Sequence, residues 1–346
     1  MAERNNDIIL SLKDVKVHFK LDEGLLKAVD GVSFDIKKGR TLGIVGESGC
    51  GKSVTSNAIF RILPKYAQIE GEILLYEKDR KPLDEPIDIV KLNPTGPIIR
   101  SIRGGNVSMI FQEPMKAFSP VHTVGDQIIE AILLHTEPDP AKAKQIAIEA
   151  LRQVGISNPE QRYDEYPHQL SGGMRQRAMI AMALSCRPSI LIADEPTTAL
   201  DVTVQAQVLD LINNLKREIN TSVIFITHDL GVIAEMCNDV VVMYLGKVVE
   251  ACDVDTLFYN PRHPYTQALL KSIPTADKAH KGRFDSIEGT VPYPINLPVE
   301  CGFRSRCELA QAGLCDKGEP PAVEIEPGHY VKCFRVEETA RGKGEK

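Results

Sequence analysis

Residues 41–53 read TLGIVGESGCGKS, and this stretch decides how the rest of the chain is interpreted. Its apolar start, 41–45, predicts a buried strand, and residues 52–63, which have helical spacing and end before Pro64, predict a helix. The spacing G-x-x-x-x-G-K-S between them predicts a glycine-rich turn whose backbone N–H groups point inward. Because the helix N-terminus adds partial positive charge, this loop is suited to bind phosphate.

The same loop predicts specific contacts with a bound nucleotide. Lys52 is expected to reach the β- and γ-phosphates of ATP, and Ser53 to ligate Mg²⁺. The alternative is an ordinary glycine turn, but a chance match of this spacing is expected in roughly one of a hundred chains of this length. We therefore expect nucleotide contacts from Gly46, Ser48, Gly49, Cys50, Gly51, Lys52, Ser53 and Val54.

Strands and helices alternate along the chain on both sides of this loop. This alternation predicts an α/β fold with a mostly parallel sheet that is covered by helices. Short β-branched and aromatic runs predict further strands at 8–12, 15–19, 32–36, 73–76, 107–111, 190–193, 223–227 and 240–244. Apolar residues at helical spacing predict helices at 124–133, 141–154, 204–218 and 231–236.

The composition is ordinary for a globular protein, with 43% hydrophobic and 25% charged residues among 346. A net charge of −6 excludes a global basic field, so we expect no nucleic-acid partner. The first ten residues, MAERNNDIIL, lack the pattern of a secretory signal. No apolar run reaches the roughly 18–20 residues that span a bilayer. Any membrane role is therefore expected to depend on partner subunits.

A second chemical feature is the apolar run ILIAD at 190–194, which is followed by another acidic residue. Asp194, at the carboxyl end of this expected strand, should hold Mg²⁺ directly or through water. Glu195 should polarise the attacking water as a general base. Taken alone, a strand that ends in Asp-Glu more often precedes a solvated loop. Together with the phosphate-binding loop, the pair favours a catalytic interpretation.

Residues 170–177, LSGGMRQR, resemble the signature of ABC ATPases, which is LSGGQ followed by basic residues. The fifth position is Met174 rather than glutamine, a departure from the family pattern. Independently of the resemblance, Ser171, Gly172 and Gly173 at a helix start present free N–H groups suited to a γ-phosphate. A simple N-capped helix is the alternative. On the first interpretation, one chain carries two half-sites for one ligand.

Four more positions resemble family motifs, in the family's order. Gln112, within FQEP, resembles the Q-loop residue that senses Mg²⁺ and the attacking water and links to the membrane domains. Asp201, within ALD, resembles the D-loop residue at the subunit interface, and His228, within ITHD, the switch residue that contacts the γ-phosphate. Phe19 matches the aromatic position that stacks on adenine, although an aromatic on an early strand is equally typical of a core.

The resemblance covers about residues 8–260 and implies a RecA-like P-loop core with an N-terminal antiparallel β-subdomain. It also implies head-to-tail dimerisation, with Lys52 of one subunit opposite Ser171 of the other, so that ATP joins the dimer and hydrolysis releases it. The expected domains are 1–114 with 181–258 for the ATPase core, 115–180 for an α-helical subdomain, and 259–346 for an irregular cysteine-bearing extension.

Residues 260–270, NPRHPYTQALL, resemble an element of the ATPase subunits of oligopeptide, dipeptide and nickel importers. The resemblance implies a subunit that hydrolyses Mg-ATP to power uptake of dipeptides or oligopeptides through separate membrane subunits. A nickel or other small-solute importer of the same subfamily is one alternative. A soluble ABC ATPase with no role in transport is another.

Partners and location also follow from this resemblance. It implies a second ABC ATPase subunit, which we expect to be a different paralogue, with a homodimer as the alternative. It implies two transmembrane permease subunits and, indirectly, an extracytoplasmic peptide-binding protein. The chain is then expected to lie peripherally on the cytoplasmic face of the cell membrane.

Half of the eight cysteines fall in the proline-rich C-terminal segment. Such a segment buries little apolar surface and needs another source of stability. Four thiolates suit an iron–sulfur cluster or zinc, and wide spacing without a close C-x₂₋₄-C pair favours [4Fe–4S]. Zinc, and free or disulfide-bonded thiols, are the alternatives. Arg304 and Arg306 are expected to offset the charge of a cluster held by Cys301, Cys307, Cys315 and Cys333.

Overall fold

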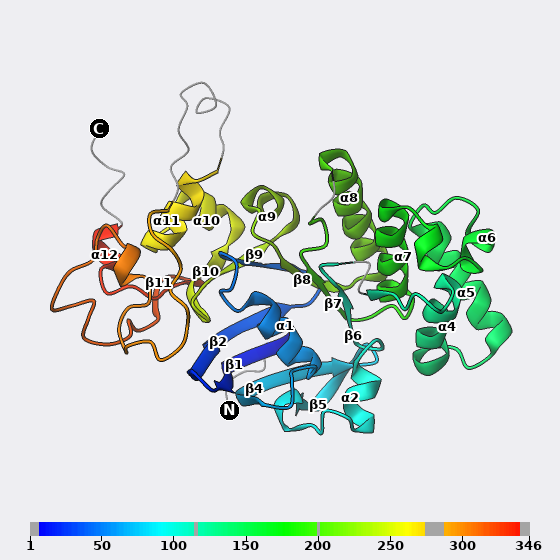
Figure 1. Ribbon diagram of the computed structural model, residues 1–346, viewed down its shortest axis with the longest axis horizontal. Helices are drawn as coiled ribbons and strands as arrows, with labels where there is room; N and C mark the ends of the chain where they lie inside the picture. The colour runs from blue at the N-terminus through cyan, green and yellow to red at the C-terminus, as the bar shows by residue number, and fades with distance from the viewer. Residues whose placement is uncertain (1–6, 114–116, 199–200, 274–286, 340–346) are drawn as a thin grey trace.

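The computed structural model describes residues 7–113, 117–198, 201–273 and 287–339. Two sheets organise these residues (Figure 1). One has four antiparallel strands in the order β2-β1-β4-β5, and the other has eight strands in the order β11-β12-β10-β9-β3-β8-β7-β6. The fold is therefore α/β with a separate antiparallel sheet, as the sequence predicts. No helix within the described ranges is both long and apolar enough to cross a membrane.

The four-stranded sheet is built from long strands near the N-terminus. The two short strands expected at 8–12 and 15–19 form one strand with a bulge between Leu12 and Val15, where Asp14 takes a left-handed φ of 47°. The last strand of this sheet is polar and carries two prolines, so no strand was expected there. The strands are β1 (Ile8–Leu21), β2 (Gly24–Lys37), β4 (Ala67–Lys78) and β5 (Lys81–Asp88).

The centre of the eight-stranded sheet is parallel and buried on both faces. Successive residues alternate between two cores: Leu191 and Ala193 belong to one cluster, and Ile190 and Ile192 to the other. Continuous apolar runs of this kind are typical of parallel strands covered on both sides. The parallel strands, with β6 at the edge of the sheet, are β3 (Thr41–Val45), β6 (Val107–Ile110), β7 (Ile190–Asp194), β8 (Ser222–Ile226) and β9 (Asp239–Tyr244).

Helices pack around this sheet, and four of them form a separate group at one end of the molecule. Figure 1 shows α4 to α7 as a group at the opposite end of the molecule from the C-terminal strands. The group consists of α4 (Val124–His135), α5 (Pro140–Gln153), α6 (Pro159–Tyr163) and α7 (Gly172–Leu184). Further helices that the described residues form before residue 240 are α1 (Lys52–Phe60), α2 (Pro97–Ile102), α8 (Val202–Ile219) and α9 (Leu230–Met236).

The C-terminal region adds strands to the main sheet. β12 pairs antiparallel with β10, with Glu250 opposite Val331, and β11 pairs with β12. Residues far apart in sequence therefore share one sheet. Elements of this region are β10 (Lys247–Asp253), α10 (Val254–Tyr259), α11 (Pro264–Lys271), β11 (Val323–Glu326), β12 (His329–Val331) and α12 (Val336–Thr339). Three 3₁₀ turns are η1 (Ile89–Lys91), η2 (Pro167–Gln169) and η3 (Arg304–Arg306).

Candidate functional site

The loop between β3 and α1 requires glycine at two positions. Gly46 has a φ of 153° and Gly51 a φ of 99°. A Cβ at Gly46 would lie 2.2 Å from the carbonyl oxygen of Met243, and one at Gly51 would lie 2.3 Å from that of Ala28. Conformation and space both exclude other side chains there. The expected strand, glycine turn and helix are thus present at the carboxyl end of β3, the edge where ligands bind in open α/β sheets.

Lys52 and Ser53 are the first two residues of α1, which follows this loop directly. The ammonium of Lys52 donates to the carbonyl oxygens of Gly46, at 2.7 Å, and Glu47, at 3.1 Å. These bonds keep the ammonium group of Lys52 at the opening of the loop. Phosphate oxygens of a bound nucleotide can accept there in place of the two carbonyl oxygens. The hydroxyl of Ser53 donates to Oδ1 of Asp194 at 3.2 Å. Of the three side chains expected at Mg²⁺, Ser53 and Asp194 are therefore neighbours, whereas Gln112 donates to Glu195.

Asp194 lies at the end of β7 and is only 5% exposed. Burial raises the pKa of this carboxyl, and the hydrogen bond from Ser53 lowers the pKa and offsets part of that rise. A buried carboxylate with one hydroxyl partner has free oxygen lone pairs. This donor set, one carboxylate and one hydroxyl, is of the kind that Mg²⁺ prefers.

Glu195 follows in a left-handed conformation, with a φ of 46°. Its Oε2 accepts from Nε2 of Gln112 at 3.0 Å and from Oγ1 of Thr198 at 2.9 Å. Nδ1 of His228 lies 3.4 Å from its Oε1. The structure therefore brings the three expected catalytic residues together from the ends of β6, β7 and β8. Thr198 was not expected from the sequence, in which its only signal is a hydroxyl three residues after the glutamate.

The signature segment begins α7. Ser171 caps this helix, because its hydroxyl accepts from the N–H of Met174 at 3.3 Å. A Cβ at Gly172 would meet nothing within 4 Å, and one at Gly173 only Val204, at 3.8 Å. Packing within one chain therefore does not require these glycines. Figure 1 shows α7 within the helical group and apart from α1, so one chain does not bring its two phosphate-facing segments together.

The two remaining expected contacts are less distinctive. Phe19 is half-buried on β1, and its ring centroid lies 5.8 Å from that of Tyr66, tilted by 60°. Asp201 caps α8 by accepting from the N–H of Val204 at 2.9 Å. Pro114 of the Q-loop motif and Ala199 and Leu200 of the D-loop motif lie outside the described residues.

The four C-terminal cysteines line one cavity, together with His263 and Phe303 among others. They reach it from separate parts of the irregular segment. Burial raises the pKa of the Cys333 thiol to about 11 and also raises the pKa of Cys301 and Cys307. Arg304 and Arg306 both pair with carboxylates, those of Glu300 and Glu47. Protein carboxylates are thus the partners of both guanidinium groups.

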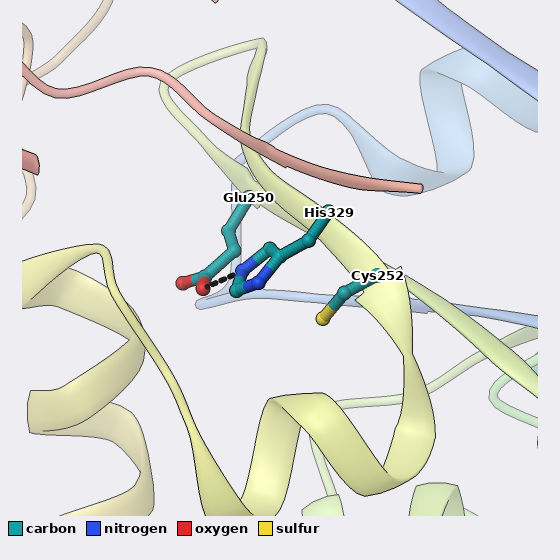
Figure 2. Close-up of side chains that lie close together, drawn as sticks. All are labelled: Glu250, Cys252 and His329. Carbon is teal, nitrogen blue, oxygen red and sulfur yellow. Dashed lines mark hydrogen bonds and ion pairs between the residues drawn. The ribbon is translucent and has the colours of Figure 1, made fainter. Parts of the chain in front are cut away.

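A cluster of Glu250, Cys252 and His329 was not expected from the sequence. Their ligand atoms all lie within 4.8 Å of one another. Figure 2 shows the three side chains close together. The carboxylate of Glu250 accepts from Nε2 of His329 at 2.8 Å, and from the backbone N–H groups of Arg262 at 2.8 Å and His263 at 2.9 Å. Burial raises the pKa of the Cys252 thiol. This cluster anchors the NPRHP segment to β10 through hydrogen bonds.

Two family models match the sequence. One, described as "ABC transporter", matches residues 29–198. The other, described as "Oligopeptide/dipeptide transporter, C-terminal region", matches residues 249–315. Together they span the loop, the signature segment, the acidic pair and three of the four clustered cysteines.

Several named proteins are similar over nearly the whole chain. A probable peptide ABC transporter ATP-binding protein of Sinorhizobium fredii is 48% identical, over 96% of each chain. The oligopeptide transport ATP-binding protein AppD of Bacillus subtilis is 47% identical, over 95% of this chain and 97% of its own. The dipeptide transport ATP-binding protein DppD of the same organism is 45% identical, over 96% of each chain.

A solved structure with a similar fold is a dimeric ATP-binding cassette in a post-hydrolysis state, bound to ADP and phosphate. It is 26% identical, with a TM-score of 0.60, and the alignment covers 71% of this chain and 98% of that one. Another dimeric structure of the same cassette has 27% identity and the same TM-score. The shared fold is thus that of nucleotide-binding cassettes that pair.

Proposed function

Since this chain belongs to the ABC transporter family, we propose that it is the ATP-binding and ATP-hydrolysing subunit of a peptide importer. The observation that carries the proposal is the convergence at one sheet edge. The phosphate loop with Lys52, the Ser53–Asp194 pair, and Glu195 with its partners Gln112 and His228 all lie there. Peptide as the substrate is supported by the names of the relatives and by the second family model.

Each residue then has a chemical role. The loop N–H groups and Lys52 bind the β- and γ-phosphates. Ser53 and Asp194 fit a Mg²⁺ ion, which, when bound, offsets the charge of the phosphate oxygens. Glu195 accepts the proton of the attacking water, and Gln112 and His228 orient this carboxylate and the γ-phosphate. The partners of Glu195 fix its carboxylate before substrate arrives, which lowers the reorganisation that the reaction requires.

We further propose that the site is completed by a second ATPase subunit. The open space at Gly172 supports this, because packing within the chain does not fill it. A partner's phosphates would reach the N-terminus of α7, and the partner's signature would reach the phosphates bound at Lys52. We expect this partner to be a different paralogue, with two permease subunits in the membrane and an extracytoplasmic peptide-binding protein delivering cargo. The chain would then act at the cytoplasmic face of the membrane.

Glu195→Gln tests the catalytic proposal. The amide keeps the size and hydrogen bonding of the side chain but cannot take a proton, so ATP turnover should fall about a hundredfold or more. Binding of ATP should persist, and the variant should accumulate as an ATP-bound dimer in light-scattering measurements. Glu218→Gln, on the exposed end of α8, is the control and should hydrolyse ATP normally. Unchanged turnover in Glu195→Gln would exclude Glu195 as the base.

Co-purification distinguishes the transporter from a soluble ATPase. The proposal expects tagged full-length chain to recover hydrophobic membrane subunits in detergent, and addition of peptide-loaded binding protein to raise ATP turnover. Stimulation by Ni²⁺-loaded binding protein but not by peptide would replace peptide with nickel as the cargo. Recovery of ribosomes or DNA without membrane subunits would contradict a transport role.

We also propose that the four cysteines hold a [4Fe–4S] cluster with a structural role. Two observations support it: all four line one cavity, and among the described residues no three of their sulfur atoms lie within 4.8 Å of one another. A tetrahedral zinc site needs sulfur atoms about 3.8 Å apart. The wider arrangement suits ligands around a larger cluster. Because the thiols must lose their protons on binding, the raised pKa of Cys333 makes retention weaker at low pH.

Anaerobic purification tests this second proposal. Protein that carries the cluster should absorb near 400 nm and contain iron and sulfide in about fourfold molar amounts. Cys315→Ser should lose the absorbance, whereas Cys186→Ser, outside the cluster, should keep it. A colourless, zinc-loaded protein would assign the site to zinc. Metal-free protein of normal stability would contradict both the iron–sulfur and the zinc assignment.

A further inference from the structure

Glu47, the second residue of the phosphate loop, is held at each of its polar groups. Its carbonyl oxygen accepts from Lys52 at 3.1 Å, which is a contact within the loop. Its backbone N–H donates to the hydroxyl of Tyr265 at 2.9 Å. Its carboxylate accepts from Arg306. The contacts from Tyr265 and Arg306 therefore come from the C-terminal region, more than 200 residues along the chain.

The Arg306–Glu47 contact is a paired, charge-assisted one. Nη1 of Arg306 lies 2.7 Å from Oε2 of Glu47, and Nη2 lies 3.0 Å from Oε1. Nε of Arg306 donates to the carbonyl oxygen of Glu288 at 3.0 Å, so the guanidinium cannot rotate freely. Its side chain is 3% exposed, against 27% for Glu47. Planar, two-bond pairs of this kind fix geometry as well as charge.

Aromatic side chains also pack against the Arg306 guanidinium that pairs with Glu47. The Arg306 guanidinium lies 5.8 Å from the ring centroid of Tyr244 and 6.0 Å from that of Phe303. The rings of Tyr244, Tyr265 and Phe303 pack against each other with centroids 4.7 to 5.3 Å apart. All three rings are buried. The arginine thus belongs to a packed layer between the loop and the cysteine segment.

Arg304 lies in the same 3₁₀ turn but has different partners. It pairs with Glu300 and, at 4.0 Å, with Asp316, both of which belong to the extension. Of the two arginines between Cys301 and Cys307, only Arg306 contacts the phosphate loop through a salt bridge within the described residues. The two therefore form a matched pair for experiment: they have equal charge, lie between the same two cysteines, and make different contacts.

We propose that Arg306, with Tyr265, is a positioning residue of the ATP site, which makes the cysteine-bearing extension part of that site. The inference rests on the proposed binding of ATP by this loop. ATP brings several negative charges to a loop that already carries Glu47. Arg306 neutralises that carboxylate and holds it aside, and Tyr265 fixes the backbone of the same residue. Without Arg306, an unpaired carboxylate remains near the phosphates and repels them.

Binding of mant-ATP with Mg²⁺ to the full chain, followed by fluorescence, tests the proposal. Arg306→Gln should weaken binding about five- to tenfold, since one unpaired charge near the phosphates is worth on the order of one factor of ten. Arg304→Gln should bind within about twofold of wild type. In the double variant Glu47→Gln/Arg306→Gln, neither charge is left, and affinity should return to within about twofold of wild type.

Steady-state turnover separates positioning from loss of structure. Arg306→Gln should raise KM for ATP with little change in kcat at saturating ATP, because the catalytic residues are untouched. Tyr265→Phe keeps the buried ring and removes only the acceptor for the Glu47 N–H, so it should weaken mant-ATP binding about two- to fivefold. This second variant keeps the test decisive if Arg306→Gln does not fold.

Three outcomes would overturn the inference. They are wild-type affinity in both Arg306→Gln and Tyr265→Phe, no recovery in the double variant, or an equal loss in Arg304→Gln. An equal loss in Arg304→Gln would show that the weaker ATP binding comes from the loss of positive charge near the cysteines and not from the contact with Glu47. Absence of mant-ATP binding by the wild-type chain would instead remove the proposed function, so the two failures are distinguishable.

Discussion

Glu195 shows how one residue can be foreseen by type but not by environment. The sequence predicts a base directly after a buried aspartate, and the structure places a carboxylate there with three side-chain partners. Its φ of 46° is unusual for a residue with a side chain and is the kind of strain that functional sites retain. The pattern Asp-Glu specifies neither the conformation nor Thr198 as a partner.

Gly172 and Gly51 give a prediction at the residue scale. Gly172→Ala should leave the melting temperature unchanged or slightly higher, because its Cβ meets nothing within 4 Å and alanine favours a helix. ATP turnover should nevertheless fall at least about tenfold, since the methyl group would occupy the space where we propose that the partner's nucleotide binds.

Gly51→Ala is the contrasting substitution in the same assays. Its φ of 99° and the approach to Ala28 should cost stability and remove ATP binding. Normal turnover in Gly172→Ala would contradict a nucleotide approaching the N-terminus of α7.

At the scale of elements, α11 is fixed by a buried histidine. His263 caps this helix, because its Nδ1 accepts from the N–H of Tyr265 at 3.1 Å. The residue is 2% exposed, and burial lowers its pKa from 6.5 to about 4 even though Glu250 acts in the opposite direction. The imidazole is therefore neutral in the folded chain. The sequence predicted an irregular extension from residue 259, not a helix that begins at a buried histidine cap.

This depressed pKa predicts pH-dependent stability. Above pH 6.5 the histidine is neutral in both the folded and the unfolded chain, so it has no effect there. As the pH falls from 6.5 towards 4, only the unfolded chain takes up the proton, and the free energy of unfolding should fall by roughly 2 kcal/mol at pH 5. Urea unfolding at pH 7.5 and pH 5 measures the difference.

His263→Asn provides the control, because asparagine caps helices and does not titrate. The variant should lose less stability than wild type between pH 7.5 and pH 5. Burial raises the pKa of Glu250, but hydrogen bonds from His329 and from the backbone N–H groups of Arg262 and His263 help to bring it below 4.5, so Glu250 contributes only at lower pH. An equal loss in the variant would show that His263 is not the group that titrates.

The strands also show where the pattern of residues is not enough to predict an element. β3, β7, β8 and β9 are buried on both faces, and their apolar runs predict them closely. β5 has the sequence KPLDEPID and was not predicted. It is an edge strand that pairs only with β4, so solvent accepts its polar side chains and its prolines need no ladder partner.

At the scale of the whole molecule, the C-terminal extension packs against the core and pairs with its sheet, so it is more than a segment linked only through the chain. β12 continues the main sheet, and Phe303 and Val331 are buried. The Arg306–Glu47 pair joins positions 259 apart in sequence. We therefore expect folding of this region to depend on the core being in place, and β10 to be stabilised in turn by its pairing with β12.

A truncated chain that ends at residue 286 tests this mutual dependence. It would expose the edge of β10 and the layer around Tyr265, so its melting temperature should fall by at least about 5 °C, with increased aggregation. A chain that ends at residue 339 keeps every described element and should melt like the full chain. Equal melting of the two truncations would show that the extension does not stabilise the core.

The sequence by itself determined the chemistry of the ATP site, because each of its parts is a short local pattern. A glycine spacing specifies a turn, an apolar run that ends in Asp-Glu specifies the sheet edge, and Ser-Gly-Gly specifies an open helix start. Only the tertiary structure decided that four spaced cysteines line one cavity, that Thr198 joins Glu195, and that Arg306 pairs with Glu47. Those contacts depend on where distant segments return to the sheet, and no local pattern encodes that path.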